Sequence, residues 1–279
     1  MRKPSTTEIE DIVERALAED LPDITGEAIF GAEEKGMATI VAKENGVLAG
    51  MPFVRAVFAT LDSAADVETM VDEGGTLEPG TTVARISARV RALLAGERTA
   101  LNLLQRASGI ATATRRYVDA VRGTSAKIYD TRKTAPGLRA LDKYAVVAGG
   151  GENHRYAARD MFLIKNNHID HAGSIAAAIR RVRESGREEK VMVEVRSFEE
   201  LDQAVAESPD LILLDNMTTD EMREAVRRVA GRIPLEASGG ITLESVRAIA
   251  ETGVERISVG ALTHSVKALD LSMKASGEG

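Results

Sequence analysis

The segment VMVEVRSFEELDQAVAESPDLILLDN, from Val191 to Asn216, contains two apolar runs separated by a helical stretch. The first run, Val191 to Val195, is short and apolar, which is typical of a buried strand. The stretch from Ser197 to Glu207 has helical character, and Leu211 to Leu214 forms the second run. A strand, a helix and another strand at this spacing indicate parallel strands joined by a crossover helix.

The same alternation continues on both sides of this segment. The further predicted strands are Ala126 to Tyr129, Met161 to Ile164, Ile233 to Leu235 and Arg256 to Val259, and the further helices are Ser174 to Glu184, Thr219 to Val229 and Leu243 to Glu251. An open sheet and a barrel both fit the pattern. About six strands is fewer than the eight of a complete barrel, so the pattern is compatible with an incomplete α/β barrel.

The chain changes character near residue 110. Before it, short strands at Ala38 to Lys43 and Val83 to Val90 are separated by turns rich in Gly and Pro. Helices are predicted at Pro52 to Leu61 and from about Ala92 to Val121, and the start of the chain resembles an amphipathic helix capped by Ser5 and Glu8.

Composition excludes several classes of function. The chain of 279 residues has no cysteine, which excludes disulfides, thiolate zinc sites and a cysteine nucleophile. The formal net charge of -7 gives no support for binding to nucleic acid or to a membrane. There is no apolar run long enough to span a bilayer, and the N-terminus lacks the apolar core of a signal peptide. These features fit a cytoplasmic protein.

Polar side chains follow each predicted strand of the second half. In a parallel βα array the carboxyl ends of the strands lie at one face, where such barrels place their active sites. Five basic residues lie at these ends or in the loops beside them: Arg132, Lys133, His154, Arg155 and Lys165. A set of solvated surface charges is the alternative, but so many cations at one face predict a polyanionic ligand.

Two carboxylates and two glycine turns complete the set. Glu194 and Asp215 lie at strand ends, where they either pair with nearby cations or hold hydrated Mg²⁺ or the hydroxyls of a sugar. Ser238-Gly239-Gly240 and Gly260-Ala261 follow the last two predicted strands, and such turns let backbone N–H groups approach a phosphate. His168 is expected to orient the loop after Lys165.

These residues belong to motifs that resemble one known family. The pattern TRKT-x-PG, then GGG-x-x-HR, then IK-x-NH lies between Thr131 and Ile169, and VEV, LLDNM, EASGGIT and ISVGALTHS follow in order. The combination resembles the quinolinate phosphoribosyltransferases, and the resemblance covers most of the chain from Gly96 to Ser265.

The resemblance implies an architecture and a reaction. The expected fold is an incomplete α/β barrel of about six or seven parallel strands over residues 111–265, with an N-terminal α/β sandwich domain over residues 1–110 that the segment 266–279 joins. The expected reaction transfers phosphoribose from PRPP to quinolinate, uses Mg²⁺, and yields nicotinate mononucleotide, pyrophosphate and CO₂ for the biosynthesis of NAD. The expected assembly is a homodimer.

The resemblance also assigns residues. Those expected to bind quinolinate are Arg132, His154, Arg155 and Lys165, with Arg98 supplied across the dimer interface. Those expected near PRPP and its phosphates are Thr131, Lys133, Glu194, Asp215, Ser238, Gly239, Gly240, Val259, Gly260 and Ala261. Lys133, Lys165, Glu194 and Asp215 are the expected catalytic groups, and Glu194 and Asp215 the expected Mg²⁺ ligands. Arg196 and Asn166 depart from the acidic residues that the family often has at these positions.

Alternatives remain open at the level of sequence. One is a paralogue of the same fold with another substrate, such as the members associated with molybdenum transport, although the intact IK-x-NH motif favours quinolinate. Another is an aldolase that forms a Schiff base on Lys165. A third is a protein that binds a phosphorylated ligand without catalysis.

Overall fold

The computed structural model describes residues 3–277, and the chain folds into two compact units. Unit 1 comprises residues 1–115, 134–150 and 262–279, and unit 2 comprises residues 116–133 and 151–261. The segment 134–150 therefore belongs to unit 1, although it lies within the range predicted for the barrel domain. The predicted boundary at residue 110 stays a prediction.

Unit 1 is built on an antiparallel sheet of order β12-β1-β5-β3. Its elements are α1 (Thr6–Leu17), α2 (Ile24–Ile29), β1 (Lys35–Ala42), β2 (Gly46–Val47), α3 (Met51–Leu61), β3 (Asp66–Thr69), β4 (Thr76–Leu77), β5 (Thr82–Arg89), α5 (Arg139–Ala148) and β12 (Leu271–Gly277). Two helices, α4 (Val90–Ala120) and α11 (Ala261–His264), have residues in both units. The C-terminal strand β12 pairs with β1, so the end of the chain completes the N-terminal sheet.

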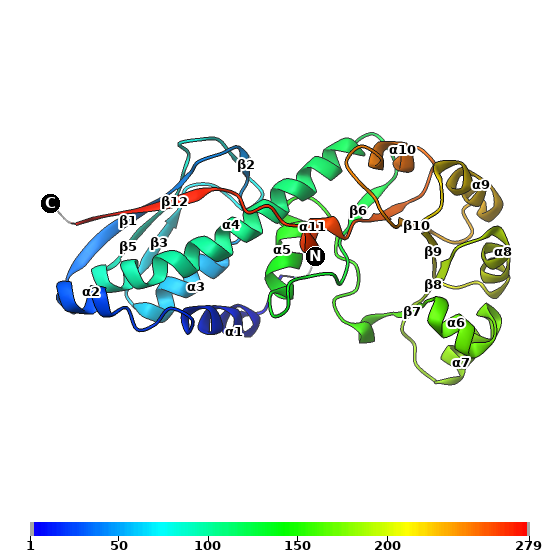
Figure 1. The fold of residues 1–279 in the computed structure, drawn as a ribbon, viewed down its shortest axis with the longest axis horizontal. Coiled ribbons are helices and arrows are strands. Elements are labelled where there is room, and N and C mark those ends of the chain that lie inside the picture. Colours follow the sequence, from blue (N-terminus) through cyan, green and yellow to red (C-terminus); the bar gives the residue numbers. More distant parts are fainter. Residues whose placement is uncertain (1–2, 278–279) are drawn as a thin grey trace. The chain divides into compact units, whose positions relative to one another are not determined.

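Local sequence explains the main elements of unit 1. The capping box of Ser5 and Glu8 begins α1, as the sequence predicts. In β1 the side chains of Ala38, Ile40 and Ala42 are buried, which is the alternation of a strand with one face on a core. Helix α3 lies in the same unit (Figure 1), and its side chains include the fully buried Phe53 and Phe58.

Unit 2 carries a parallel sheet of order β6-β11-β10-β9-β8-β7. Its elements are β6 (Lys127–Tyr129), the 3₁₀ helix η1 (Ala158–Asp160), β7 (Phe162–Ile164), α6 (Asn166–Ala172), α7 (Ile175–Glu184), β8 (Val191–Val195), α8 (Phe198–Glu207), β9 (Leu211–Asp215), α9 (Thr219–Val229), β10 (Leu235–Ser238), α10 (Val246–Ala250) and β11 (Arg256–Ser258). Within the described residues β6 and β7 do not pair, so the barrel is incomplete, as predicted (Figure 1).

Strand β10 lies later in the chain than the sequence predicted. The strand begins at Leu235 and reaches Ser238, whereas the sequence predicted Ile233 to Leu235. Pro234 explains the difference because it has no N–H to donate to a neighbouring strand. The carbonyl of Pro234 still accepts a hydrogen bond from the N–H of Ile212, at 3.1 Å. Ser238 therefore lies within the strand rather than after it.

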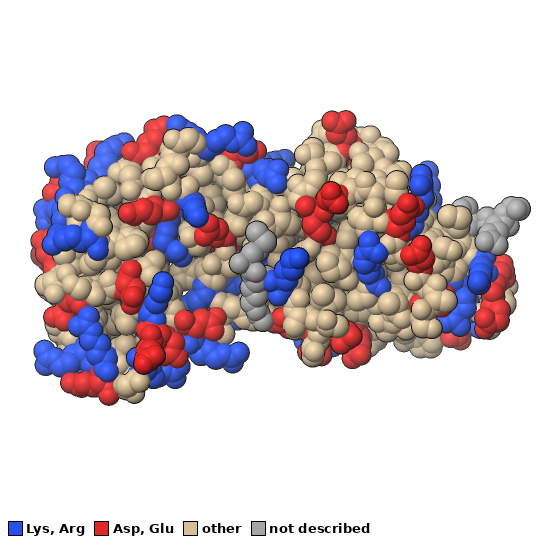
Figure 2. Space-filling view, turned by 180° about the vertical axis from the view of Figure 1, so that it is seen from behind, with Lys and Arg blue, Asp and Glu red and all other residues tan. Residues whose placement is uncertain are grey.

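The surface carries both signs of charge. On the face shown in Figure 2, Lys and Arg are interspersed with Asp and Glu, which is typical of a solvated protein surface. Across residues 3–277, no helix is both long and apolar enough to cross a membrane.

Candidate active site

The register of unit 2 places three predicted site residues at neighbouring strand ends. Glu194 on β8 pairs with Leu213 on β9. Asp215, two residues after Leu213 on the same strand, pairs with Ser238 on β10. Alternate residues of a strand face the same side of its sheet. Glu194, Asp215 and Ser238 therefore share one face at the carboxyl ends of β8, β9 and β10.

Lys165 joins this group through an ion pair. Its Nζ lies 3.1 Å from Oε2 of Glu194, whose side chain is nearly buried, while the Lys165 side chain is half exposed. The backbone N–H of Lys165 donates to Nδ1 of His168 at 2.9 Å. His168 thus fixes the start of α6 and the loop that carries Lys165, as the sequence predicts.

A buried carboxylate connects the other two cationic loops. Asp130 follows β6 and is fully buried, and its two oxygens accept hydrogen bonds from Nδ2 of Asn153 at 2.7 Å and from the backbone N–H of His154 at 2.8 Å. This contact brings the loop of Arg132 against the loop of Arg155. Burial, and next the positive charge of Arg132, lower the pKa of Arg155. Nη1 of Arg155 donates a 3.0 Å hydrogen bond to the carbonyl of Met161.

His154 has a protein contact at each ring nitrogen. Its Nδ1 accepts a hydrogen bond from the N–H of Arg155 at 2.8 Å, and its Nε2 lies 3.3 Å from Oε1 of Glu236. Glu236 has no exposed surface, and its Oε2 accepts a 2.7 Å hydrogen bond from Nε of Arg256. The sequence analysis missed Glu236 and Arg256. The only signal in the sequence is that Glu236 lies two residues before Ser238 and so faces the same side.

The turn after β10 has a backbone that requires glycine. Gly239 has a φ of +101°, and a Cβ there would lie 2.2 Å from Oδ1 of Asn216. The N–H of Asn216 donates to the carbonyl of Ser238 at 2.9 Å, so the two turns are held side by side. At the end of β11, the N–H of Val259 donates to the carbonyl of Tyr129 at 2.9 Å. Gly260 and Ala261 follow directly.

Gly239→Ala is expected to destabilise the protein more than Gly231→Ala does. Gly231 also has a positive φ, of +71°, but a Cβ there would meet no atom within 4 Å. Both substitutions incur backbone strain, and only the first adds a clash with Asn216. We expect an extra loss of about 1–3 kcal/mol in the free energy of unfolding, measured by urea denaturation. Equal losses would show that the contact with Asn216 is loose.

The remaining predicted residues fall into two groups. Thr131, Arg132 and Lys133 follow β6 in unit 2, and Arg132 and Lys133 are exposed. Arg98 belongs to unit 1, where it lines a pocket with Asp20 and Asp23. All the predicted site residues except Arg98 thus belong to unit 2.

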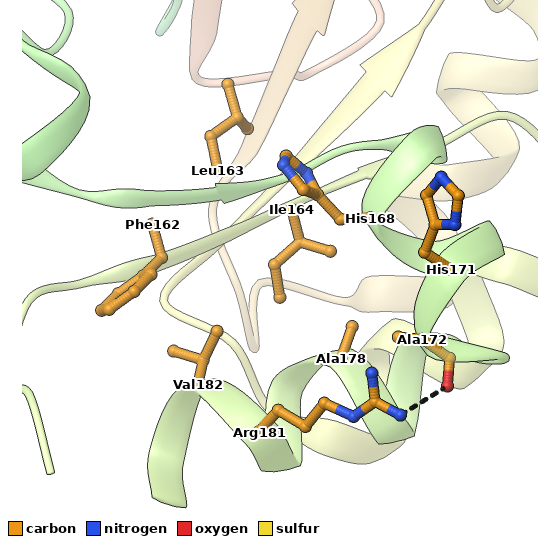
Figure 3. A pocket seen from close by; sticks show the side chains of 9 residues that line it. All are labelled: Phe162, Leu163, Ile164, His168, His171, Ala172, Ala178, Arg181 and Val182. Atoms are coloured by element: carbon orange, nitrogen blue, oxygen red, sulfur yellow. Dashed lines mark hydrogen bonds between the residues drawn. The ribbon is translucent and has the colours of Figure 1, made fainter. Parts of the chain in front are cut away.

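A pocket beside β7 is distinct from the group at the strand ends. It is lined by β7, α6 and α7, with His168 and His171 projecting from α6 (Figure 3). Phe162 and Ile164 point toward α7, whereas Leu163 points to the opposite side of the strand. Leu163 packs there against the core cluster of β8 and β9. Lys165, two residues after Leu163, follows on that inner side.

The donor set at the strand ends suits a particular kind of cation. Among the described residues, no group of three or more His, Cys, Asp or Glu side chains could hold a metal ion. Mg²⁺ commonly binds through one or two carboxylates and completes its shell with water and substrate phosphates. Glu194 and Asp215, on neighbouring strands, fit that mode and do not form a cage of their own.

Family models match nearly the whole chain. The model described as quinolinate phosphoribosyl transferase, C-terminal domain, matches residues 110–274, and the model of the N-terminal domain matches residues 23–108.

Curated relatives and solved structures agree with these matches. The chain is 47% identical over 274 residues to the nicotinate-nucleotide pyrophosphorylase (carboxylating) of Mycobacterium leprae (strain TN), covering 94% of this chain and 95% of that relative. It is 40% identical to quinolinate phosphoribosyltransferase (decarboxylating) 2b, mitochondrial, of Nicotiana tabacum, covering 98% and 84%. The crystal structure of NadC from Streptococcus pyogenes matches all of both chains with a TM-score of 0.95 at 38% identity.

Proposed function

Since the chain belongs to the quinolinate phosphoribosyltransferase family, we propose that it transfers phosphoribose from PRPP to quinolinate and releases pyrophosphate and CO₂. The product is nicotinate mononucleotide, a precursor of NAD. The observation that supports this most strongly is the convergence at the strand ends of unit 2: Lys165 pairs with Glu194, and buried Asp130 joins the loop of Arg132 to the loop of Arg155.

The cationic loops suit a dicarboxylate. Quinolinate carries two carboxylates on adjacent carbons of a pyridine ring, and guanidinium groups bind carboxylates in a bidentate manner. Burial, and next the positive charge of Arg132, lower the pKa of Arg155, so a bound dianion would offset both effects. We assign them to its carboxylates, with Lys165 and the loop of His154 completing the site. Bound in this way, the ring nitrogen is aimed at C1′ of PRPP.

The opposite side of the site suits PRPP. Displacement of pyrophosphate from C1′ builds positive charge on the ribose ring, and fixed carboxylates stabilise such charge. We assign this role to Glu194 and Asp215. Thr131 and Lys133 would bind PRPP phosphates, and the backbone N–H groups of the two turns, Ser238 to Gly240 and Val259 to Ala261, would bind the 5′-phosphate.

Mg²⁺ is the cofactor that we propose, held by Glu194 and Asp215 together with PRPP. When bound, it would neutralise charge on the pyrophosphate group. Lys133 and Lys165 supply positive charge to the same leaving group.

Decarboxylation needs no further cofactor. The new bond from the ring nitrogen to C1′ makes the pyridine cationic. The bond from C2 to its carboxylate then breaks, its electron pair stays on C2 beside the cationic nitrogen, and a proton replaces CO₂. The transfer step itself supplies the electron sink.

We further propose a homodimer in which Arg98 of the partner subunit reaches the quinolinate site. The support is that the segment from Gly96, which contains Arg98, resembles the motifs of the family. Equilibrium sedimentation and mixing of Arg98→Ala with Arg132→Ala subunits test this: mixed dimers should recover activity in one of their two sites.

The aldolase alternative is disfavoured by the environment of Lys165. A Schiff base requires a neutral amine, which burial in an apolar pocket or a neighbouring cation would favour. Lys165 is half exposed and its Nζ contacts the carboxylate of Glu194, so the residue does not lie in an apolar pocket. Borohydride should therefore trap no carbonyl adduct on Lys165.

Product analysis tests the proposed function. The purified protein is incubated with PRPP, Mg²⁺ and either quinolinate or nicotinate, and nicotinate mononucleotide is quantified by chromatography. We expect product from quinolinate and little from nicotinate, which lacks one carboxylate. Product from nicotinate alone would contradict the assignment, and no product from either would favour the paralogue.

A further inference from the structure

A row of polar side chains occupies the inner face of the unit 2 sheet, where barrels are usually filled by aliphatic residues. Glu152 accepts 2.6 Å hydrogen bonds from Nζ of Lys127 and from the hydroxyl of Tyr129. The guanidinium carbon of Arg256 lies 3.6 Å from the centroid of the Tyr129 ring, and Nε of Arg256 donates to Glu236. The row therefore leads across β6, β11 and β10 to Glu236, the neighbour of His154.

Glu236 faces two donors. Oε2 accepts a hydrogen bond from Nε of Arg256, whereas Oε1 has no hydrogen-bond partner among the described residues and lies 3.3 Å from Nε2 of His154. The 2.7 Å ion pair between Nε of Arg256 and Oε2 holds Glu236 as a carboxylate. A buried carboxylate oxygen requires a donor, and Nε2 of His154 is in position to be that donor.

The other nitrogen of His154 fixes where its proton lies. Nδ1 accepts the N–H of Arg155 at 2.8 Å, so Nδ1 carries no proton. The proton of the neutral ring is then on Nε2, toward Glu236. Protonation of both nitrogens would break the contact with Arg155. The arrangement thus favours one neutral form of His154.

We propose that Glu236 is a positioning residue for quinolinate: it fixes His154 as the neutral Nε2–H imidazole, whose Nδ1 accepts the backbone N–H of Arg155 and so holds that residue in the loop from which its Nη1 donates to the carbonyl of Met161. From the sequence, His154 is predicted to be a cation of the site. We propose that it contributes orientation instead, and that the positive charge comes from Arg132, Arg155 and Lys165. The inference rests on the proposed function because Arg155 is assigned there to quinolinate.

The first test reads the tautomer in the wild-type protein. Imidazole ¹⁵N chemical shifts are measured at neutral pH on protein labelled with ¹⁵N-histidine, and His154→Asn identifies the resonances of His154. We expect a protonated Nε2 and an unprotonated Nδ1. A proton on Nδ1, or on both nitrogens, would overturn the proposal. This test does not depend on catalytic activity.

The second test uses Glu236→Gln. The amide has one acceptor and one donor group, so it cannot accept from Arg256 and His154 at once. We expect KM for quinolinate to rise about tenfold, the effect of one lost charge-assisted hydrogen bond, while KM for PRPP stays unchanged. Glu255→Gln is the matched control. Oε2 of Glu255 accepts a hydrogen bond from the N–H of Leu235, the residue before Glu236 on β10, and an amide oxygen can still accept it.

A double variant shows whether Glu236 acts through His154. In a His154→Ala background, Glu236→Gln should add no further rise in KM for quinolinate. Additive effects, equal changes for both substrates, or an unchanged KM would each overturn the proposal. If Glu236→Gln does not fold, the tautomer of His154 measured in the wild-type protein still tests the proposal. If the wild-type protein transfers no phosphoribose, the proposed function fails and the tautomer still tests this contact.

Discussion

Arg132→Ala is expected to lower kcat/KM for quinolinate by about a hundredfold, since a bidentate contact from arginine to carboxylate contributes about 2–3 kcal/mol. Its side chain is exposed, so we expect little change in the free energy of unfolding. Removing it also relieves the repulsion of Arg155. The loss should therefore appear in quinolinate use and not in stability.

The measurement is steady-state kinetics at saturating PRPP, together with thermal unfolding. Arg223→Ala is a suitable control because Arg223 is an exposed residue of α9 whose ion pair is with Asp220, three residues away on the same helix. An Arg132→Ala enzyme with unchanged kcat/KM for quinolinate would remove Arg132 from the site.

Glu194→Gln is expected to lower kcat by about a hundredfold to a thousandfold, the effect of losing one fixed group that stabilises charge in a transition state. Gln has nearly the same shape but no charge to stabilise the ribose cation. The change also removes the ionic partner of Lys165, 3.1 Å away. PRPP affinity, measured by calorimetry, should fall as well if Glu194 contributes to its site.

Glu200→Gln is the matched control for Glu194. Glu200 lies on α8, the helix that follows β8, and forms an exposed ion pair with Arg196. Exposed pairs of this kind contribute about 0–1 kcal/mol to stability, and this one is not assigned to the site. A Glu194→Gln enzyme with the kcat and PRPP affinity of the Glu200→Gln enzyme would contradict the assigned role.

The strands and helices of unit 2 could be predicted because each is a short apolar or amphipathic run with clear boundaries. The prediction for β8 was Val191 to Val195, which is its observed span. Helix α9 begins with a capping box at Thr218 and Glu221, a strong local signal. Where one residue changed the hydrogen bonding, as Pro234 did before β10, the prediction was displaced.

Helices α5 and α6 were not predicted. Leu138, before α5, makes no side-chain capping hydrogen bond, and the helix is stabilised by burying residues such as Leu141 and Val146. Helix α6 begins at Asn166 within the motif rich in polar residues that was interpreted as a loop. Tertiary burial, rather than local propensity, determines the first of these.

The candidate site was predictable in part. Polar residues after apolar strands identified Lys165, Glu194 and Asp215, because parallel topology brings strand ends together. The role of Glu236 could not be predicted in this way. It lies inside a strand, and its partners come from other segments: the sheet register places Arg256 beside it, and the fold of the loop after residue 151 brings His154.

One measurement tests the central claim most directly: the stoichiometry of CO₂ and pyrophosphate released from quinolinate labelled with ¹³C in the 2-carboxylate. We predict one labelled CO₂ for each pyrophosphate, and none when PRPP is omitted. Release of label without PRPP, or pyrophosphate without label, would contradict the account.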